Sequence, residues 1–284
     1  RCDMDFITFN GHHLMERCLD RGPLRSGIQS VGSVRGASSH QHNPFVMLCD
    51  HNADGDIGVC YGAMLLYSGN FEAAVECSQY ENSRLVMGIH PYHFGWTLEP
   101  NGSFTAPEAA MVCSPNGFGQ MSRQYHRAIR EHLLREPWAG QRKPVLVNNW
   151  EATYFNFNAD KLAEIAKEAA PLGIELFVMD DGWFGRRNDD NAGLGDWYVN
   201  TEKLPGGLEA LAPRIRELGM KFGIWMEPEM VNEDSQLYRQ HPDWVLRVPC
   251  RTPARGRGQL VLDFSRKGVR EHSDGQLEKV LSSA

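Results

Sequence analysis

The sequence lacks the features of several protein classes. It carries a net charge of −7 over 284 residues and no cluster of Lys and Arg, which argues against a nucleic-acid partner. No apolar run reaches the length of a membrane span, so we expect no membrane association. The seven cysteines form no CxxC pair, and their odd number and irregular spacing indicate neither a zinc site nor a disulfide framework. We therefore expect mostly buried thiols in a reducing compartment, and a cytoplasmic protein.

Signals for a cofactor and for complete chain ends are also missing. No GxGxxG follows any predicted strand, and no complete set of metal ligands is visible, so we predict no cofactor. The chain begins at Arg1 with neither an initiator Met nor a signal peptide, and it ends at Ala284 just after a helix-like segment. We expect a fragment of a longer protein, whose hydrophobic content of 42% is ordinary for a globular chain.

Residues 1–116 are predicted to form a β-sandwich, because short apolar runs alternate there with turn residues. Residues 50–55 resemble the first half of an EF-hand loop, but the twelfth position is Tyr61, so we expect a hairpin turn. His40 and His42 share one strand face without a third ligand, which favours a hydrogen-bonding role. The predicted strands cover residues 6–9, 44–48, 57–61, 62–67 and 85–89.

The period of the apolar residues changes after residue 116. Met121 and Tyr125 lie on one face at helical spacing, which predicts a linking helix within residues 117–140. Strands and helices then alternate over residues 141–284. Three strands separated by helices, each ending in polar and aromatic residues, indicate the first three β/α units of a (β/α)8 TIM barrel, although a doubly wound sheet would alternate similarly.

The central stretch of the chain is an apolar strand, residues 176–178, that runs into Asp180 and Asp181. The carboxyl end of a parallel strand is where such folds bind ligands. Successive strand residues point to opposite faces, so both aspartates can serve one ligand only if the backbone turns, which Gly182 permits. An Asp-Asp-Gly turn that merely caps a strand is the alternative.

The predicted strand ends carry Trp150, Asp180, Asp181 and Trp225, and Arg257 follows further along the chain. Carboxylates accept hydrogen bonds from sugar hydroxyls, indole faces cover the apolar patch of a pyranose, and a guanidinium donates to sugar oxygens. Taken together, these residue types predict a sugar-binding site.

These residues lie in motifs that closely resemble glycoside hydrolase family 36, the microbial-type α-galactosidases. The resemblance covers nearly the whole chain. The matching motifs are residues 35–44 (RGASSHQHNP), 149–152 (NWEA), 179–184 (MDDGWF), 195–197 (GDW), 223–230 (GIWMEPEM), 241–244 (HPDW) and 260–266 (LVLDFSR).

The resemblance implies an α-galactosidase that hydrolyses terminal α-D-galactosides, such as melibiose and raffinose-type oligosaccharides, with retention. Asp180 and Asp181 would bind galactose hydroxyls, Trp150 and Trp225 would wall the galactose subsite, and Arg257 would hydrogen-bond the sugar or its carboxylate partners. The motif that contains Glu227 and Glu229 shapes a strand end in the family. The family often has an aromatic residue at the position of His13.

The resemblance also implies that the catalytic residues lie outside this chain. In the family the nucleophile is the Asp of a Lys-Trp-Asp motif after the fourth strand, and the acid/base is an Asp near the sixth. No Lys-Trp-Asp occurs here, so we expect this stretch alone to be inactive. Retention needs two carboxyl groups about 5 Å apart across the glycosidic bond, and the adjacent Asp180 and Asp181 are poorly placed for that.

Three alternatives stay open from the sequence. The same scaffold could carry an α-N-acetylgalactosaminidase or a raffinose-type galactosyltransferase, and the chain could also be a non-catalytic carbohydrate-binding fragment. The partner implied by the family is a galactoside oligosaccharide, and the intact protein is expected to be a homo-oligomer, a tetramer in the family.

Overall fold

The computed structural model describes residues 2–12, 14–38, 41–253 and 255–284, and the chain divides into two compact units, residues 1–141 and 142–284. The interpretations that concern His13 and His40 fall on residues outside these ranges.

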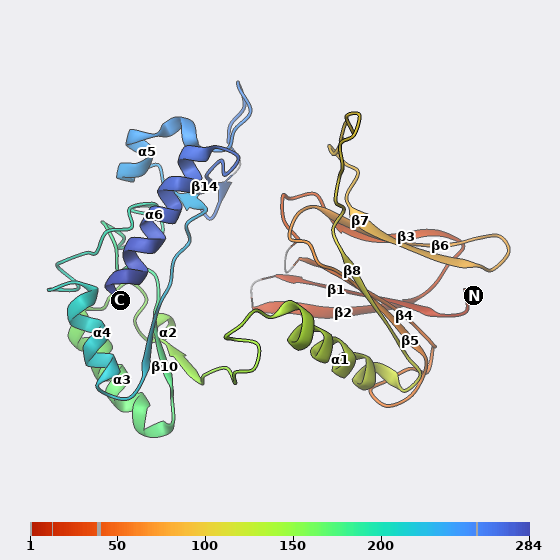
Figure 1. Cartoon of the computed structure of the whole chain (residues 1–284), viewed down its shortest axis with the longest axis horizontal. Helices are drawn as coiled ribbons and strands as arrows, with labels where there is room; N and C mark the ends of the chain where they lie inside the picture. The colour runs from red at the N-terminus through yellow and green to blue at the C-terminus, as the bar shows by residue number, and fades with distance from the viewer. Residues whose placement is uncertain (1, 13, 39–40, 254) are drawn as a thin grey trace. The chain divides into compact units, whose positions relative to one another are not determined.

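Two antiparallel sheets form most of the first unit (Figure 1). One sheet has five strands in the order β2-β1-β4-β5-β8, and the other has three in the order β3-β6-β7. The strands are β1 Asp5–His12, β2 Met15–Pro23, β3 Gly27–Ser33, β4 His42–Cys49, β5 Cys60–Leu65, β6 Phe71–Cys77, β7 Ser83–Ile89 and β8 Ala109–Ser114.

The apolar faces of these two sheets pack against each other. Phe6 of β1 and Val46 of β4 come from the larger sheet, and Ala73 and Val75 of β6 come from the smaller one, all of them buried in one cluster. Along β6 every second side chain is buried, as expected for a strand with one face toward a core. The N-terminal part of the chain is therefore a β domain, as predicted.

The two predicted strands 57–61 and 62–67 are wrong as separate elements. The structure has one strand there, β5, because residues 57–59 still belong to the connection from β4. Asp54 Oδ1 accepts the N–H groups of Asp56 and Ile57, at 2.8 and 2.9 Å, and so closes the turn. The EF-hand-like segment is accordingly a hairpin connection, as predicted. The strands β2, β3, β6 and β8 were not predicted.

The helix α1, Gly117–Ala128, covers the other face of the five-stranded sheet (Figure 1). It ends in a short π-helical turn, Ile129–Leu133. Met121 and Tyr125 are buried against Ile7 and Met47 of the sheet, and the Tyr125 hydroxyl donates to the Ala110 carbonyl at 3.2 Å. The five-stranded sheet is therefore the middle layer of the first unit.

The expectation of no disulfide is wrong for one pair. Cys2 and Cys77 are bonded to each other, with Cα atoms 5.8 Å apart. The two residues are 75 positions apart in the sequence, and Cys77 ends β6 of the smaller sheet while Cys2 precedes β1 of the larger one, so the packing of the two sheets brings them together. Among the cysteines that the structure shows as free, Cys49 and Cys60 are buried, but Cys113 and Cys250 are exposed.

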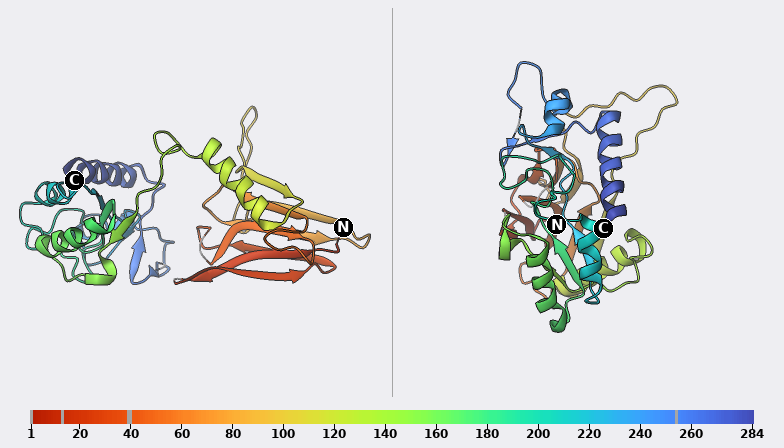
Figure 2. Two further views of the ribbon diagram at one scale, coloured as in Figure 1. Left: turned by 90° about the horizontal axis from the view of Figure 1, so that it is seen from below. Right: turned by 90° about the vertical axis from the view of Figure 1, so that its left-hand side faces the viewer.

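The second unit is built on three parallel strands in the order β11-β10-β9. They are β9 Leu146–Asn148, β10 Leu176–Met179 and β11 Lys221–Ile224. The helices α3, Ala159–Ala169, and α4, Leu208–Arg216, connect them and lie side by side (Figure 1, Figure 2). Their apolar residues share one core with Phe177 and Met179 of β10. This β-then-α order is the start of a barrel, as predicted.

The remaining elements of the second unit follow the β strands or lie beyond them. Three very short strands form a separate antiparallel sheet in the order β12-β14-β13. The remaining elements are α2 Trp150–Thr153, the 3-10 turns Ala170–Leu172 and Pro242–Trp244, β12 Met230–Val231, α5 Gln236–Gln240, β13 Arg255–Gly256, β14 Gln259–Val261 and α6 Lys267–Ser283. Within the described residues of the chain, no helix is long and apolar enough to cross a membrane.

Candidate functional site

Polar and aromatic side chains gather where the three parallel strands end. Trp150 follows β9, Asp180 follows β10 and Trp225 follows β11. The parallel register places these ends at one edge of the sheet, and the Trp225 N–H donates to the Met179 carbonyl at 2.8 Å. Three of the five predicted site residues therefore share this edge.

Asp180 is held by the asparagines that end β9. The Asn148 side-chain amide donates to Asp180 Oδ2 at 2.5 Å, and Asn149 Oδ1 accepts the backbone N–H of Asp180 at 2.8 Å. Asp180 Oδ1 also accepts the backbone N–H of Asp181 at 2.7 Å. A carboxylate offers about four lone-pair sites, so roughly two remain on this half-buried group for a ligand.

The backbone turns directly after the two aspartates, as the sequence predicted. Gly182 has a φ of +102°, a backbone conformation that residues other than glycine rarely adopt. A Cβ at this position would lie 2.9 Å from Cδ1 of Phe155. The close approach of the Phe155 ring gives a second reason for glycine here.

Asp181 points into the protein, where Arg187 binds it. Arg187 Nε donates to Oδ1 and Oδ2 of Asp181 at 3.0 and 3.1 Å, and Nη2 donates to Oδ2 at 2.8 Å. Both side chains are buried, with Arg187 at 0% exposure. The two neighbouring aspartates therefore have different surroundings, and the sequence did not indicate which of them would be buried against an arginine.

The two predicted tryptophans rest on aromatic neighbours. Trp150 is half-buried, with the rings of Tyr154 and Phe155 at 5.2 and 5.0 Å between centroids. Trp225, also half-buried, stacks on Phe184 at 6.4 Å with the rings inclined by 14°. Because each ring is supported on one side and partly open, each can present indole surface to a ligand.

Arg257 lies in the exposed turn between β13 and β14, away from the strand ends in sequence. Its guanidinium is paired with Asp190, Nη2 to Oδ1 at 3.2 Å. Asp190 Oδ1 is also 3.4 Å from Nη2 of Arg187. Arg257 is thus connected to Asp181 through two intervening side chains.

Glu227, which follows Trp225 by two residues, is a carboxyl group whose pKa is raised. Burial raises the pKa of Glu227, and the nearby Glu229 carboxylate adds to this, while Arg257 and Arg187 act in the opposite direction. Its Oε2 atom is buried and accepts no hydrogen bond from the described residues.

Lys203 is a second charged group at the turn, and it is half-buried. Its Nζ donates to the carbonyls of Phe155, Gly182 and Arg187 at 3.0, 2.8 and 3.2 Å. Burial lowers the pKa of Lys203, and Asp181 opposes that effect. Lys203 therefore ties the Gly182 turn to the loop that carries Arg187.

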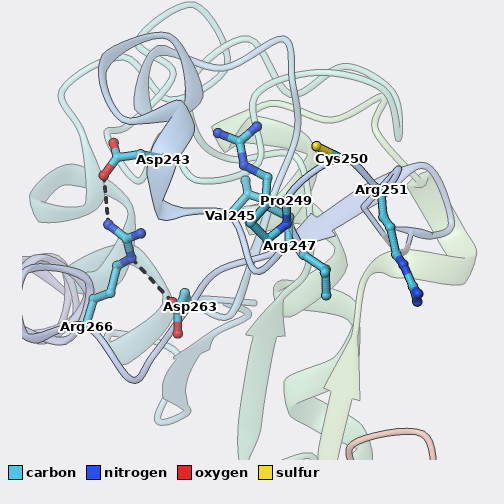
Figure 3. Close-up of a pocket in the computed structure, with 9 residues that line it drawn as sticks. Asp243, Val245, Arg247, Pro249, Cys250, Arg251, Asp263 and Arg266 are labelled. Carbon is cyan, nitrogen blue, oxygen red and sulfur yellow. Dashed lines mark hydrogen bonds and ion pairs between the residues drawn. The ribbon is translucent and has the colours of Figure 1, made fainter.

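A separate pocket lies on the loop after α5 (Figure 3). It measures about 410 Å³, and Arg266 joins two of its walls by ion pairs to Asp243 and Asp263. None of the five predicted site residues lines it. No group of three or more His, Cys, Asp or Glu is arranged to hold a metal ion in the part of the chain that the structure describes.

Sequence reasoning missed Arg187, Asp190 and Lys203 as parts of this region. The asparagines at positions 148 and 149 could have been found, because they end a predicted strand just as Asp180 does. Arg187 offers no such signal, since it lies in a loop without a periodic pattern and is covered in part by Asn232 and Phe155, which are distant in the sequence.

Comparison with known proteins places this arrangement among carbohydrate-active enzymes. Residues 1–99 match the family model of the glycosyl hydrolase family 36 N-terminal domain, and residues 103–284 match the Melibiase model. Alpha-galactosidase AgaA of Geobacillus stearothermophilus is 51% identical over 99% of this chain and 39% of its own length. Alpha-galactosidase 1 of Pediococcus pentosaceus is 48% identical over 98% of this chain and 38% of its own length.

Solved structures agree with the sequence matches. The crystal structure of AgaA superposes with a TM-score of 0.96 at 50% identity and covers 100% of this chain, which corresponds to 39% of that protein. Variants of AgaA have also been crystallised in complex with stachyose and with raffinose. The chain therefore spans about two fifths of the length of the relatives it matches.

Proposed function

Because the chain belongs to glycosyl hydrolase family 36, we propose that the whole protein is an α-galactosidase. It would release terminal non-reducing α-D-galactose, with retention, from melibiose and raffinose-type oligosaccharides. The observation that carries the proposal is the set of carboxylate and indole groups at the ends of β9, β10 and β11. The sequence identity of 51% to an α-galactosidase supports it. The stachyose and raffinose complexes of AgaA variants support the substrate class.

The roles we assign follow from what each group has free. Asp180 accepts galactose hydroxyls through its unused lone pairs. Trp150 and Trp225 wall the subsite with their open indole faces. Asp181 contributes a fixed negative charge and accepts a hydrogen bond from a sugar hydroxyl, and Arg257 donates to a sugar oxygen.

The chemical step requires carboxyl groups other than these two aspartates. A retaining mechanism places a nucleophile and an acid/base about 5 Å apart on opposite sides of the glycosidic bond. Asp181 is held by the Arg187 fork, which would oppose its attack on an anomeric carbon. We assign both aspartates to binding, and the nucleophile and the acid/base to residues outside this chain.

We also propose that β9, β10 and β11 with their helices are the first three β/α units of a (β/α)8 barrel. The parallel register and the β-then-α order support this count. A homo-oligomeric assembly, a tetramer by family resemblance, is part of the same proposal.

The test is to assay the whole protein on 4-nitrophenyl α-galactoside and on melibiose. We expect turnover, and NMR of the first product should show α-galactose, since retention keeps the anomeric configuration. β-Galactose appearing first would contradict retention. The same assay is run on 4-nitrophenyl α-N-acetylgalactosaminide and with an added acceptor sugar. Three outcomes would each replace the proposed activity by one of the alternatives: turnover of the α-N-acetylgalactosaminide alone, galactosyl transfer to the acceptor in place of hydrolysis, or sugar binding without turnover.

A further inference from the structure

Arg187 is the most completely buried charged side chain near the candidate site. Its guanidinium contacts five oxygen atoms: two of Asp181, and one each of Asn232, Asp190 and the Ala192 carbonyl. A buried cation is stable only when it is paired and hydrogen-bonded, and here each nitrogen of the guanidinium has a partner.

The orientation of the guanidinium is held by an aromatic ring as well as by these hydrogen bonds. Its carbon lies 5.6 Å from the centre of the Phe155 ring, which covers one face of the group. The backbone of Arg187 is held as well, because its carbonyl accepts from Lys203 Nζ at 3.2 Å. A fork held in this way fixes the plane of the Asp181 carboxylate.

The same side chain connects Asp181 to the second charged group proposed for the sugar. Asp190 Oδ1 lies 3.4 Å from Nη2 of Arg187 and 3.2 Å from Nη2 of Arg257. Positive and negative groups therefore alternate in the order Asp181, Arg187, Asp190, Arg257. Because Arg257 is otherwise exposed on a turn, Asp190 is the contact that limits its freedom.

We propose that Arg187 is a positioning residue of the galactose subsite, which fixes Asp181 directly and Arg257 through Asp190. This inference rests on the proposed function. Arg187 itself is fully buried and touches no sugar, so it acts only through the two groups that it holds. A purely structural role would make a different prediction, namely lower stability with unchanged catalysis by the molecules that remain folded.

The experiment uses the whole protein and kcat/KM on 4-nitrophenyl α-galactoside. Arg187→Lys keeps the charge but removes the fork, and a displaced binding group lowers kcat/KM on the order of 100-fold. The matched control is Arg21→Lys in the first unit, where Arg21 Nε donates to Asp5 at 2.6 Å far along the chain from the site. We expect that control to keep the kcat/KM of the unaltered protein.

The decisive comparison introduces Arg187→Lys into an Asp181→Asn background. If Arg187 acts only through Asp181 and Asp190, the second substitution lowers kcat/KM further by no more than about 10-fold, the loss expected for Asp190→Asn, because residues acting as one unit are not additive. Multiplicative losses, or a normal kcat/KM in the folded Arg187→Lys protein with only a lower melting temperature, would overturn the proposal.

A second variant keeps the test informative if Arg187→Lys does not fold. Asp190 is half-exposed, so Asp190→Asn should fold, and it removes the charge between the two arginines. We expect Asp190→Asn to lower kcat/KM on the order of 10-fold in the unaltered protein. In a protein that already carries Arg257→Lys, adding Asp190→Asn should lower kcat/KM no further. An unchanged kcat/KM in Asp190→Asn would contradict the claim that Arg187 fixes Arg257 through Asp190. Absence of turnover by the unaltered protein would instead reject the proposed function, so the two failures are distinguishable.

Discussion

Replacing Gly182 by alanine should disturb both the fold and the sugar subsite. The backbone there has a φ of +102°, so any Cβ introduces strain, which costs about 1–2 kcal/mol at a left-handed position. The new Cβ would also lie 2.9 Å from Phe155 Cδ1, and such overpacking typically costs about 1–3 kcal/mol more. Alanine restricts the unfolded chain and returns about 0.4–1 kcal/mol. We therefore expect a net loss of about 1–4.6 kcal/mol in the free energy of unfolding.

Gly173 provides the matched control for this substitution. It ends the helical segment after α3 with a φ of +85°, and a Cβ built there meets nothing within 4 Å. Gly173→Ala should therefore show the backbone strain alone, about 1 kcal/mol or less. The difference between the two variants isolates the contact with Phe155.

The assay is urea unfolding of the two variants beside kinetics of the whole protein. Phe155 lies against Trp150 and over the Arg187 guanidinium, so pushing its ring away should raise KM for a galactoside in Gly182→Ala and leave it unchanged in Gly173→Ala. Equal stability losses in the two variants would refute the contact argument. A large stability loss with an unchanged KM would show that Phe155 does not support the subsite.

Two further predictions concern pH and packing. Glu227 has a raised native pKa, so the folded state binds more protons than the unfolded state above pH 4.5, and stability falls as pH rises through that native pKa. Glu227→Gln should therefore gain stability relative to the unaltered protein between pH 4 and pH 7, and urea midpoints that shift equally at both pH values would contradict this. Met121→Ala should cost about 2–5 kcal/mol because Met121 is buried between α1 and the sheet, whereas Met111→Ala at an exposed position of β8 should cost little in calorimetry. A similar cost for both would argue against α1 as a packed layer.

The sequence predicted those elements whose side chains have one consistent environment. Residues 176–178 are apolar because β10 is covered, and they were found as the centre of the barrel part. The edge strand β2, in contrast, is largely exposed and carries charges along both faces, so no periodic pattern marks it. Strands of that kind are defined by their partners, here the pairing of β2 with β1, and not by their own residues.

The candidate site shows the same limit at the level of single residues. The rule that ligands bind at strand ends predicted Trp150, Asp180 and Trp225, and the structure places all three at the ends of β9, β10 and β11. The conformational freedom of glycine predicted the turn at Gly182, which the structure confirms. Whether a carboxylate faces a ligand or a buried arginine depends on how the loop after β10 folds back on the strand end. Asp181 therefore could not be distinguished from Asp180 before the structure placed Arg187 beside it.

The packing of α1 on the five-stranded sheet limits where genes of this family can recombine without disturbing the first unit. The match to the N-terminal family model ends at residue 99, yet β8 and α1 lie within the Melibiase match and complete the first unit. A genetic crossover between relatives near residue 100 would join a sheet to a foreign edge strand and helix. The buried faces of Ile7 and Met47 would then meet side chains that did not evolve with them. Crossovers after α1 would keep the three layers together, so we expect gene exchange within the family to respect that later boundary.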